Sequence, residues 1–331
     1  MNDLILAIRQ EASRILRESI VKTVIGFDAG TLPLKAQPTF ITSQTEVEKL
    51  VLNGFCQNNL AVYLTLRPKG EPLGIICRGC ESRAIRALII EQQYSRDKLY
   101  LIGVPCTGIL DWRKIEALAG ENVVAASEEG DQVIISTASG APAPDASLAG
   151  NCEHRFQRSQ MLHDSCARCL HPNPIAVDIL LGEPVPEGNP VPVPHLPHEF
   201  EAKSPIERFA YFARESERCI RCYACREACP MCYCTQCFVD HTTPRWAEST
   251  VSPAGVQSWH IMRAFHQTGR CVSCGACERA CPMDIKMTYL TEKLNDDMRK
   301  LYGFEAGMSE EQPPLATFSL YDRDRFSDKE R

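Results

Sequence analysis

The sequence lacks the features of membrane, secreted and nucleic-acid-binding proteins. Nowhere do roughly 18 apolar residues follow one another, as a membrane-spanning helix requires. Asp3, Arg9 and Glu11 interrupt the segment where a secretory signal would need an apolar run. Lysine and arginine are scattered and the net charge is −6, which argues against a nucleic-acid surface. We therefore expect a cytoplasmic protein with no membrane span and no nucleic-acid partner.

Signatures of several enzyme classes are absent as well. The chain contains no G-x-S-x-G nucleophile motif, no G-x-G-x-x-G dinucleotide fingerprint and no adjacent cysteine pair of the kind that noncubane iron–sulfur sites use. No catalytic residue can be named. Cysteine, in contrast, is abundant, with 18 residues. In a chain without an export signal these cysteines indicate thiolates that hold metal in a reducing, anaerobic cytoplasm, not a disulfide framework.

Two copies of the pattern C-x2-C-x2-C-x3-C-P run from Cys219 to Pro230 and from Cys271 to Pro282. In such a pattern three thiolates surround one 4Fe-4S cluster, and the fourth cysteine, followed by proline, binds the cluster of the other copy. Structural zinc sites instead use paired C-x2-4-C ligands. The repeat therefore predicts two 4Fe-4S clusters and electron transfer. The predicted ligands are Cys219, Cys222 and Cys225 with Cys281 for one cluster, and Cys271, Cys274 and Cys277 with Cys229 for the other.

The spacing of apolar residues predicts an α/β domain over residues 1–185. A short apolar run lies at 23–27, and strands are expected at 61–66, 73–77, 98–104, 122–126 and 132–136. Helices are expected at 3–19, 81–93 and 110–118. Because strands alternate with helices, we expect right-handed crossovers and a mostly parallel sheet.

The second half of the chain is predicted to form a mainly helical dicluster ferredoxin domain over residues 204–304. The helices expected around the repeat lie at 204–219, 258–271 and 286–304. Six prolines between Pro184 and Pro197 predict an extended, semi-rigid linker, placed at residues 186–203. Residues 305–331 are expected to form a C-terminal tail, and the small residues at 138–150 a surface loop.

Ten cysteines lie outside the repeat, and several follow predicted strands. Cys77 ends one strand, Cys80 lies just beyond it, and Cys106 follows the next strand. Parallel strands bring their C-terminal ends to the edge where α/β sheets bind ligands, so we expect these thiols to converge and hold a third 4Fe-4S cluster. The cysteines able to complete the set are Cys152, Cys166 and Cys169. The alternative is that these cysteines are small buried hydrophobic residues.

Four more cysteines have no assigned role. Cys56 stands alone and is expected to be a small buried residue. Cys232, Cys234 and Cys237 follow the first copy of the repeat directly. Three roles are open for them: binding a further metal, shielding a cluster, or replacing a ligand.

The segment GVPCTG (103–108), followed by CARCLHPNPIAVDILLGE (166–183), resembles the signatures of a known family. The family comprises the beta subunits of deazaflavin-reducing hydrogenases and of methanogen-type formate dehydrogenases, and the resemblance spans residues 20–185. It implies one FAD and one 4Fe-4S cluster in the α/β domain. It also implies that electrons pass between a catalytic partner subunit and a deazaflavin carrier.

Carried over to this sequence, the resemblance implies that Cys106, Cys166 and Cys169 bind the cluster. It further implies that Asp178 and Gly182 lie in the segment that shapes the flavin site. The cysteine pair in IICRGC (75–80) and the position of the ferredoxin domain after the α/β domain depart from the family pattern.

The leading hypothesis is an electron-transferring iron–sulfur subunit of a cytoplasmic, anaerobic oxidoreductase complex. Formate dehydrogenase, hydrogenase and heterodisulfide-reductase-like assemblies are candidate complexes, with catalytic redox subunits and a soluble electron carrier as partners. One alternative is a flavin-free iron–sulfur conductor. Another is a stand-alone iron–sulfur redox sensor, which would purify without a larger oxidoreductase.

Overall fold

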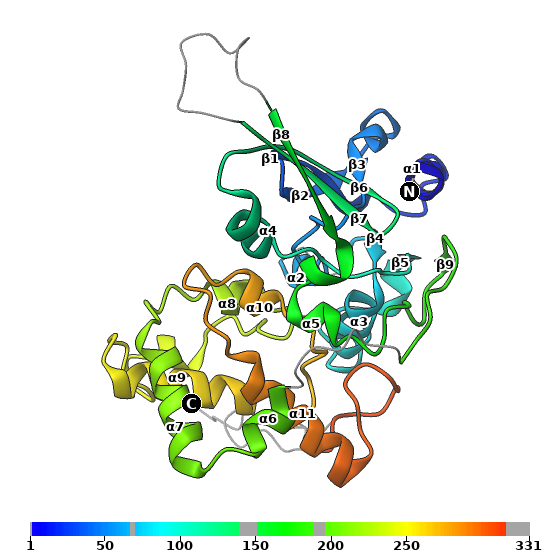
Figure 1. The fold of residues 1–331 in the computed structure, drawn as a ribbon. Helices are drawn as coiled ribbons and strands as arrows, with labels where there is room; N and C mark the ends of the chain where they lie inside the picture. Colours follow the sequence, from blue (N-terminus) through cyan, green and yellow to red (C-terminus); the bar gives the residue numbers. More distant parts are fainter. Residues whose placement is uncertain (1, 67–69, 139–150, 189–195, 316–331) are drawn as a thin grey trace, which may run out of the picture.

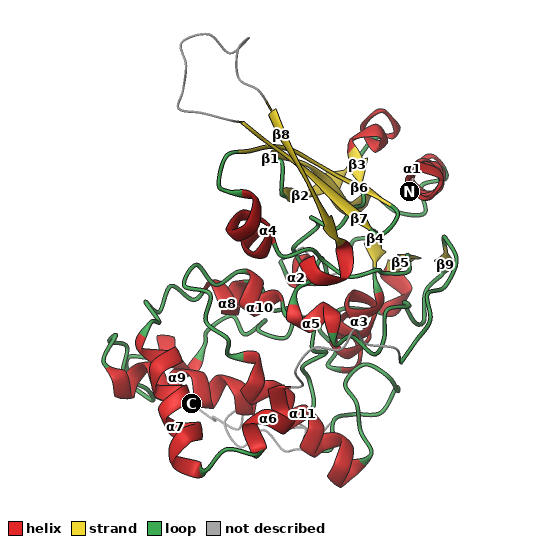
Figure 2. Ribbon diagram, viewed as in Figure 1, coloured by secondary structure: helices red, strands yellow, loops and turns green. Residues whose placement is uncertain are grey.

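The computed structural model describes residues 2–66, 70–138, 151–188 and 196–315. A strand-rich N-terminal region lies against a mainly helical C-terminal region, as Figures 1 and 2 show. Parallel strands lie in the first region and the cysteine repeat in the second. The predicted fold class is therefore confirmed in its broad form.

The main sheet has the strand order β2-β1-β4-β5-β9, with β3 paired to β1. Its strands are β1 (Thr23–Leu32), β2 (Lys35–Ile41), β3 (Leu50–Val51), β4 (Leu73–Cys77), β5 (Leu99–Gly103) and β9 (Ile179–Leu180). The pairs β1–β4, β4–β5 and β5–β9 are parallel, whereas β2 and β3 pair antiparallel with β1. The sheet is thus mixed around a parallel centre.

Helices cover both faces of the parallel centre. On one face α1 (Asn2–Arg17) packs Ile8 and Ile15 against Ile76. On the other face α3 (Gly79–Ile90) packs Ile85 against Ile75. All five residues of β4 are buried, as expected of a parallel strand that is covered on both sides.

Residues 122–126 and 132–136 form strands, as predicted, but these strands do not belong to the parallel sheet. They belong to a separate antiparallel sheet formed by β6 (Val123–Glu129), β7 (Gln132–Ala138) and β8 (Asn151–Gln157). Only Gly130 and Asp131 join β6 to β7, and Gly130 has a φ of 59°. So short a connection permits a hairpin, because a parallel crossover needs a dozen or more residues. The loop predicted at 138–150 lies outside the described residues, apart from Ala138 at the end of β7.

The strand predicted at 61–66 is wrong, because these residues form the short helix α2 (Val62–Thr65). The side chain of Asn59 accepts a hydrogen bond from the backbone N–H of Ala61 at 3.1 Å and so starts a turn in place of a strand. The other helices of the first region are α4 (Trp112–Ala119) and α5 (Asp164–Ala167), with 3-10 turns at Gln44–Lys49, Arg96–Lys98 and Arg158–Met161.

The helical region contains the three predicted long helices. These are α7 (Pro205–Glu217), α9 (Pro253–His266) and α11 (Thr288–Tyr302), with the shorter α6 (Leu196–Glu201), α8 (Ala224–Glu227), α10 (Ala276–Arg279) and a 3-10 turn at Phe238–Asp240. Ser204 and Glu207 cap α7 reciprocally, which fixes its start. The predicted extended linker is helical at α6, and residues 189–195 of it lie outside the described part.

The two regions share one hydrophobic core. Val272, Met298 and Phe304 of the helical region belong to the same buried cluster as Ile85 and Leu88 of α3. The described part of the predicted tail, residues 305–315, packs against α3, where Arg83 donates to the carbonyl of Ala306 at 2.9 Å and Arg86 to that of Met308 at 3.2 Å. The two regions are therefore joined by packing as well as by chain connection.

Within the described ranges, no helix combines the length and apolar character that a membrane crossing requires.

Because the core is shared, we predict that Phe304→Ala destabilises both regions together. Removing this buried ring is expected to lower the free energy of unfolding by about 3–5 kcal/mol. Hydrogen-exchange mass spectrometry of the cluster-loaded protein should show α3 and α11 losing protection in parallel. Phe209→Ala is the control, because the Phe209 side chain is 61% exposed. Loss of protection in α11 alone would contradict the shared core.

Candidate metal centres

The two copies of the cysteine repeat fold in the same way. In each copy the residue two positions after the first cysteine has a positive φ, 51° at Arg221 and 57° at Ser273. Its backbone N–H donates to the sulfur of that first cysteine, at 3.4 Å in both copies. A backbone folded this way turns successive N–H groups inward and favours an anionic group at the centre.

A second left-handed residue follows the second cysteine of each copy, Tyr223 in the first and Gly275 in the second. Glycine is required in the second copy, since a Cβ atom at Gly275 would lie 2.1 Å from the hydroxyl of Ser165. Ser165 belongs to α5 of the first region. The second copy is therefore pressed against the α/β region at this point.

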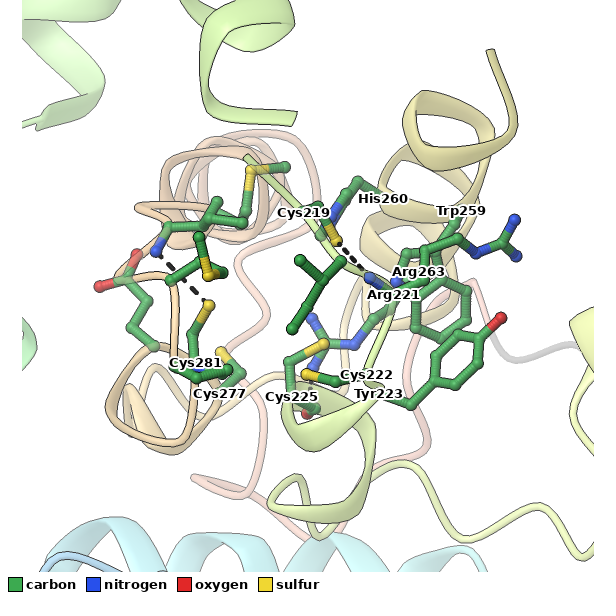
Figure 3. A pocket seen from close by; sticks show the side chains of 16 residues that line it. Cys219, Arg221, Cys222, Tyr223, Cys225, Trp259, His260, Arg263, Cys277 and Cys281 are labelled. Atoms are coloured by element: carbon green, nitrogen blue, oxygen red, sulfur yellow. Dashed lines mark hydrogen bonds between the residues drawn. The ribbon is translucent and has the colours of Figure 1, made fainter. Parts of the chain in front are cut away.

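The first triplet and the last cysteine of the second copy line one cavity, shown in Figure 3. The thiols of Cys219, Cys222 and Cys225 face it from one side and that of Cys281 from the other, next to Cys277, which also lines the second cavity. Burial raises the pKa of the Cys225 thiol, Arg263 opposes this, and the neighbouring cysteine thiols raise it further. The crossed set predicted from the sequence is thus gathered in one place.

The second triplet lines another cavity together with Cys229 from the first copy. Burial raises the pKa of Cys271 to about 12. A free thiol here stays protonated at neutral pH, so it becomes a thiolate only when a metal supplies positive charge. Cys229 sits at the end of α8 and crosses to this triplet, as Cys281 crosses to the first.

These residues fit 4Fe-4S clusters better than a single metal ion. Among the described residues, no group of three or more histidine, cysteine or acidic side chains is arranged as a site for one metal ion. Buried guanidinium groups surround the thiols, and nitrogen atoms of Arg221, Arg263 and Arg279 have no hydrogen-bond partner. Uncompensated buried positive charge is costly, and the negative charge of a thiolate-bound cluster would offset it.

A third group of thiols lies at the C-terminal edge of the parallel sheet. Cys106 lies near Cys80, Cys166 and Cys169, close enough for these thiols to influence one another's pKa. The segment after α5 makes this possible, because Pro172 accepts from the backbone N–H of Cys106 at 3.1 Å and so holds the segment across the sheet edge. Burial raises the pKa of Cys169 to about 12.

Two cysteines predicted for this third group do not join it. Cys77 is the last residue of β4 and is fully buried in the hydrophobic core, because its position in the strand directs the side chain into the sheet face. Cys152 is exposed on β8 of the antiparallel sheet. The set that converges is therefore Cys80, Cys106, Cys166 and Cys169.

The sequence analysis did not identify the ion pair that supports this third group. Arg78 is buried and paired with Glu81 at 2.9 Å, and its guanidinium also donates to the carbonyls of Cys56 and Asn58. This pair anchors the loop that starts α3 and carries Cys80. The R-x-x-E spacing at the start of a predicted helix was the available signal.

Asp178 and Gly182 have structural contacts in the described chain. The carboxylate of Asp178 accepts from the backbone N–H of Leu101 at 2.7 Å and pairs with Arg96 at 2.8 Å, which secures the entry to β9. Gly182 has a φ of 88° and lies against Leu4. These contacts do not constitute a flavin site, and the flavin stays a prediction based on resemblance.

The unassigned cysteines differ in their surroundings. Cys56 is fully buried in the core, in agreement with the expectation. Cys232 lies beside Cys229, and Gln267 donates to its sulfur at 3.3 Å. Cys237 lies near Arg226, whereas Cys234 is exposed.

Residues 215–285 match the 4Fe-4S dicluster domain family. This is an electron-transfer iron–sulfur protein. The match covers both cavities of the repeat, and it agrees with the ferredoxin part of the resemblance noted in the sequence.

Two curated proteins of methanogens are similar to this chain, one of them over nearly its full length. The chain is 23% identical to the F420-dependent formate dehydrogenase subunit beta of Methanocaldococcus jannaschii, over 91% of either chain. It is 26% identical to the F420-dependent formate dehydrogenase 1 subunit beta of Methanococcus maripaludis, over 30% of this chain and 25% of that protein. The predicted resemblance to this family of beta subunits is confirmed.

Among solved structures, the chain is similar to the F420-reducing NiFe hydrogenase complex from Methanosarcina barkeri, in a xenon derivative. The alignment has a TM-score of 0.37 and 13% identity, and it covers 48% of this chain and 57% of that chain.

The crossed geometry predicts which cluster each cysteine substitution removes. We expect Cys281→Ala to remove the same electron paramagnetic resonance signal as Cys222→Ala, because both thiols line the first cavity. Cys274→Ala should remove the other signal. If Cys281→Ala and Cys274→Ala remove the same signal, the crossed assignment is wrong.

The third group predicts a contrast between two neighbouring cysteines. Cys80→Ala is expected to lower the iron content by about four atoms per chain, because it removes one thiol of a converging set. Cys77→Ala should keep the full iron content and change stability only, since Cys77 lies in the apolar core. Iron analysis of anaerobically purified protein checks both, and equal iron loss in the two variants would contradict the assignment.

Proposed function

We propose that this chain is the electron-transferring beta subunit of a cytoplasmic, anaerobic oxidoreductase complex, with three 4Fe-4S clusters. A 4Fe-4S cluster supplies one-electron redox chemistry when bound. The residues that would hold the three clusters are Cys219, Cys222, Cys225 and Cys281; Cys229, Cys271, Cys274 and Cys277; and Cys80, Cys106, Cys166 and Cys169.

The observation that carries the proposal is the proximity of the three thiol sets. Burial raises the pKa of Cys80 in the third set, and the nearby thiol of Cys274 in the second set raises it further. The second and first sets meet at Arg263 and Cys277, which line both cavities of the repeat. The sets therefore follow one another from the sheet edge into the helical region, an arrangement that suits conduction better than isolated structural metals.

The contact between the second and third sets is fixed by side chains from both regions. Arg279 donates to the carbonyl of Cys274 at 2.6 Å and to that of Gln57 at 2.7 Å. The side chain of Asn59 lies close to the thiol of Cys274. These bonds would hold the spacing of the two sets constant, as efficient electron transfer requires.

Apolar side chains separate the first set from water. Trp259 is 1% exposed and Ile285 is 3% exposed, and both line the first cavity. Such a shell tunes the potential of a bound group by excluding solvent. Ile220, in contrast, is 55% exposed beside Cys219 and Cys222, so the first set lies near the surface, where a partner would exchange electrons.

Similarity to formate dehydrogenase beta subunits over 91% of the chain supports formate dehydrogenase as the parent complex. A catalytic subunit would then exchange electrons with this chain, and a deazaflavin would be the soluble carrier. Flavin binding is part of this proposal on the grounds of resemblance, and no residue is assigned to it.

The proposal predicts the composition of the native assembly. Tagged chain purified anaerobically from its own host should contain about 12 iron atoms. It should also co-elute with a larger oxidoreductase, and formate should bleach its iron–sulfur absorbance only in that assembly. Acid precipitation should release flavin into the supernatant.

Each alternative gives a different result in the same experiment. Full iron, an oxidoreductase partner and no released flavin would indicate a flavin-free conductor. Full iron in a chain that elutes alone would indicate a redox sensor. Hydrogen in place of formate as the effective reductant would identify a hydrogenase as the parent complex.

A further inference from the structure

We propose that Arg263 is a positioning residue for electron transfer, a shared counter-cation whose charge raises the reduction potentials of the two clusters of the repeat. This inference rests on the proposed function, because it requires both clusters to be present. It concerns a side chain that is neither a cysteine nor part of the repeat.

Arg263 is buried between the two cysteine-lined cavities. It lies in the last turn of α9 and is 7% exposed. Its side chain lines the first cavity together with Cys225 and the second together with Cys229. Figure 3 shows it in the lining of the first cavity. Among the described residues, Arg263 is the one arginine that lines both of these cavities.

The charge of Arg263 has no partner in the described chain. Its Nη2 donates to the backbone carbonyl of Cys225 at 3.1 Å, and its Nε has no hydrogen-bond partner. No carboxylate among the described residues forms an ion pair with it, whereas the groups that act on it are thiols. Of these thiols, Cys225 belongs to the first set and Cys229 and Cys277 to the second, and Cys232 lies beside Cys229.

Two other arginines near the thiols, Arg226 and Arg78, are neutralised by carboxylates. Arg226 lies next to Cys225 in sequence, yet it pairs with Asp240 at 2.8 Å and with Glu227 at 3.0 Å. Arg78 near the third set pairs with Glu81. Arg263 differs from both of them because no carboxylate neutralises its charge, which can therefore act on the clusters that the two cavities would hold.

A full positive charge in this position acts on electron affinity directly. A thiolate-bound 4Fe-4S cluster is anionic and becomes more so on reduction, and its potential depends on nearby charge and burial. Coulomb interactions are strong in a low-dielectric interior. Because the guanidinium faces both sets, its removal should make both clusters harder to reduce.

The test is potentiometric titration of the full-length, cluster-loaded protein, monitored by electron paramagnetic resonance, after iron analysis. Arg263→Gln removes the charge, and Arg263→Lys keeps it. Arg226→Gln is the matched control, because it removes an arginine next to Cys225 in sequence whose charge is already paired. We expect Arg263→Gln to shift both potentials to more negative values, while Arg263→Lys and Arg226→Gln leave both near the wild-type values.

The measured potentials of the Arg263→Gln protein decide whether Arg263 acts on both clusters. Unchanged potentials in a loaded Arg263→Gln protein would overturn the proposal, and so would a shift confined to one cluster. If Arg263→Gln fails to bind clusters, Arg263→Lys decides between two roles for the side chain. Clusters with wild-type potentials in Arg263→Lys would support the role of the positive charge. Loss of clusters from both variants would overturn the proposal and indicate that the guanidinium group is needed for packing. Absence of clusters from the wild-type protein would instead reject the proposed function.

Discussion

The exchange of one cysteine between the two copies of the repeat is the constraint on which the rest of the structure depends. Cys281 returns to the first triplet and Cys229 to the second. Neither cavity is complete without both copies, so α8 and α10 must pack together and the helices before them must be placed accordingly. Ligand loss in one copy would therefore disturb both centres, and metal binding would contribute to folding.

Charge is the second constraint. The thiols are largely enclosed, and burial by itself raises their pKa values. Buried arginines oppose this effect without carboxylate partners, as at Arg263, or with one, as at Arg78. The protein interior is thus arranged for an anionic group that balances positive charge, and a thiol set without such a group would leave that charge uncompensated.

The junction between the two regions does more than hold them together. Helix α3 packs Ile85 into the shared core and also carries Cys80. From this helix Cys80 lies close to Cys274 of the repeat. One interface therefore serves stability and the spacing of the second and third thiol sets, and the left-handed Gly275 is needed because the two regions approach so closely there.

The sequence by itself determined the local features: the cysteine repeat, the long helices and the buried strand β4, because each depends on spacing along the chain. It also indicated the crossed sets, since the repeat has a known pairing. Only the tertiary structure decided that Cys80 joins the third group while Cys77 does not, because the direction of a strand side chain depends on register. The antiparallel second sheet and the place of Arg263 between two cavities were likewise set by packing between segments distant in the chain.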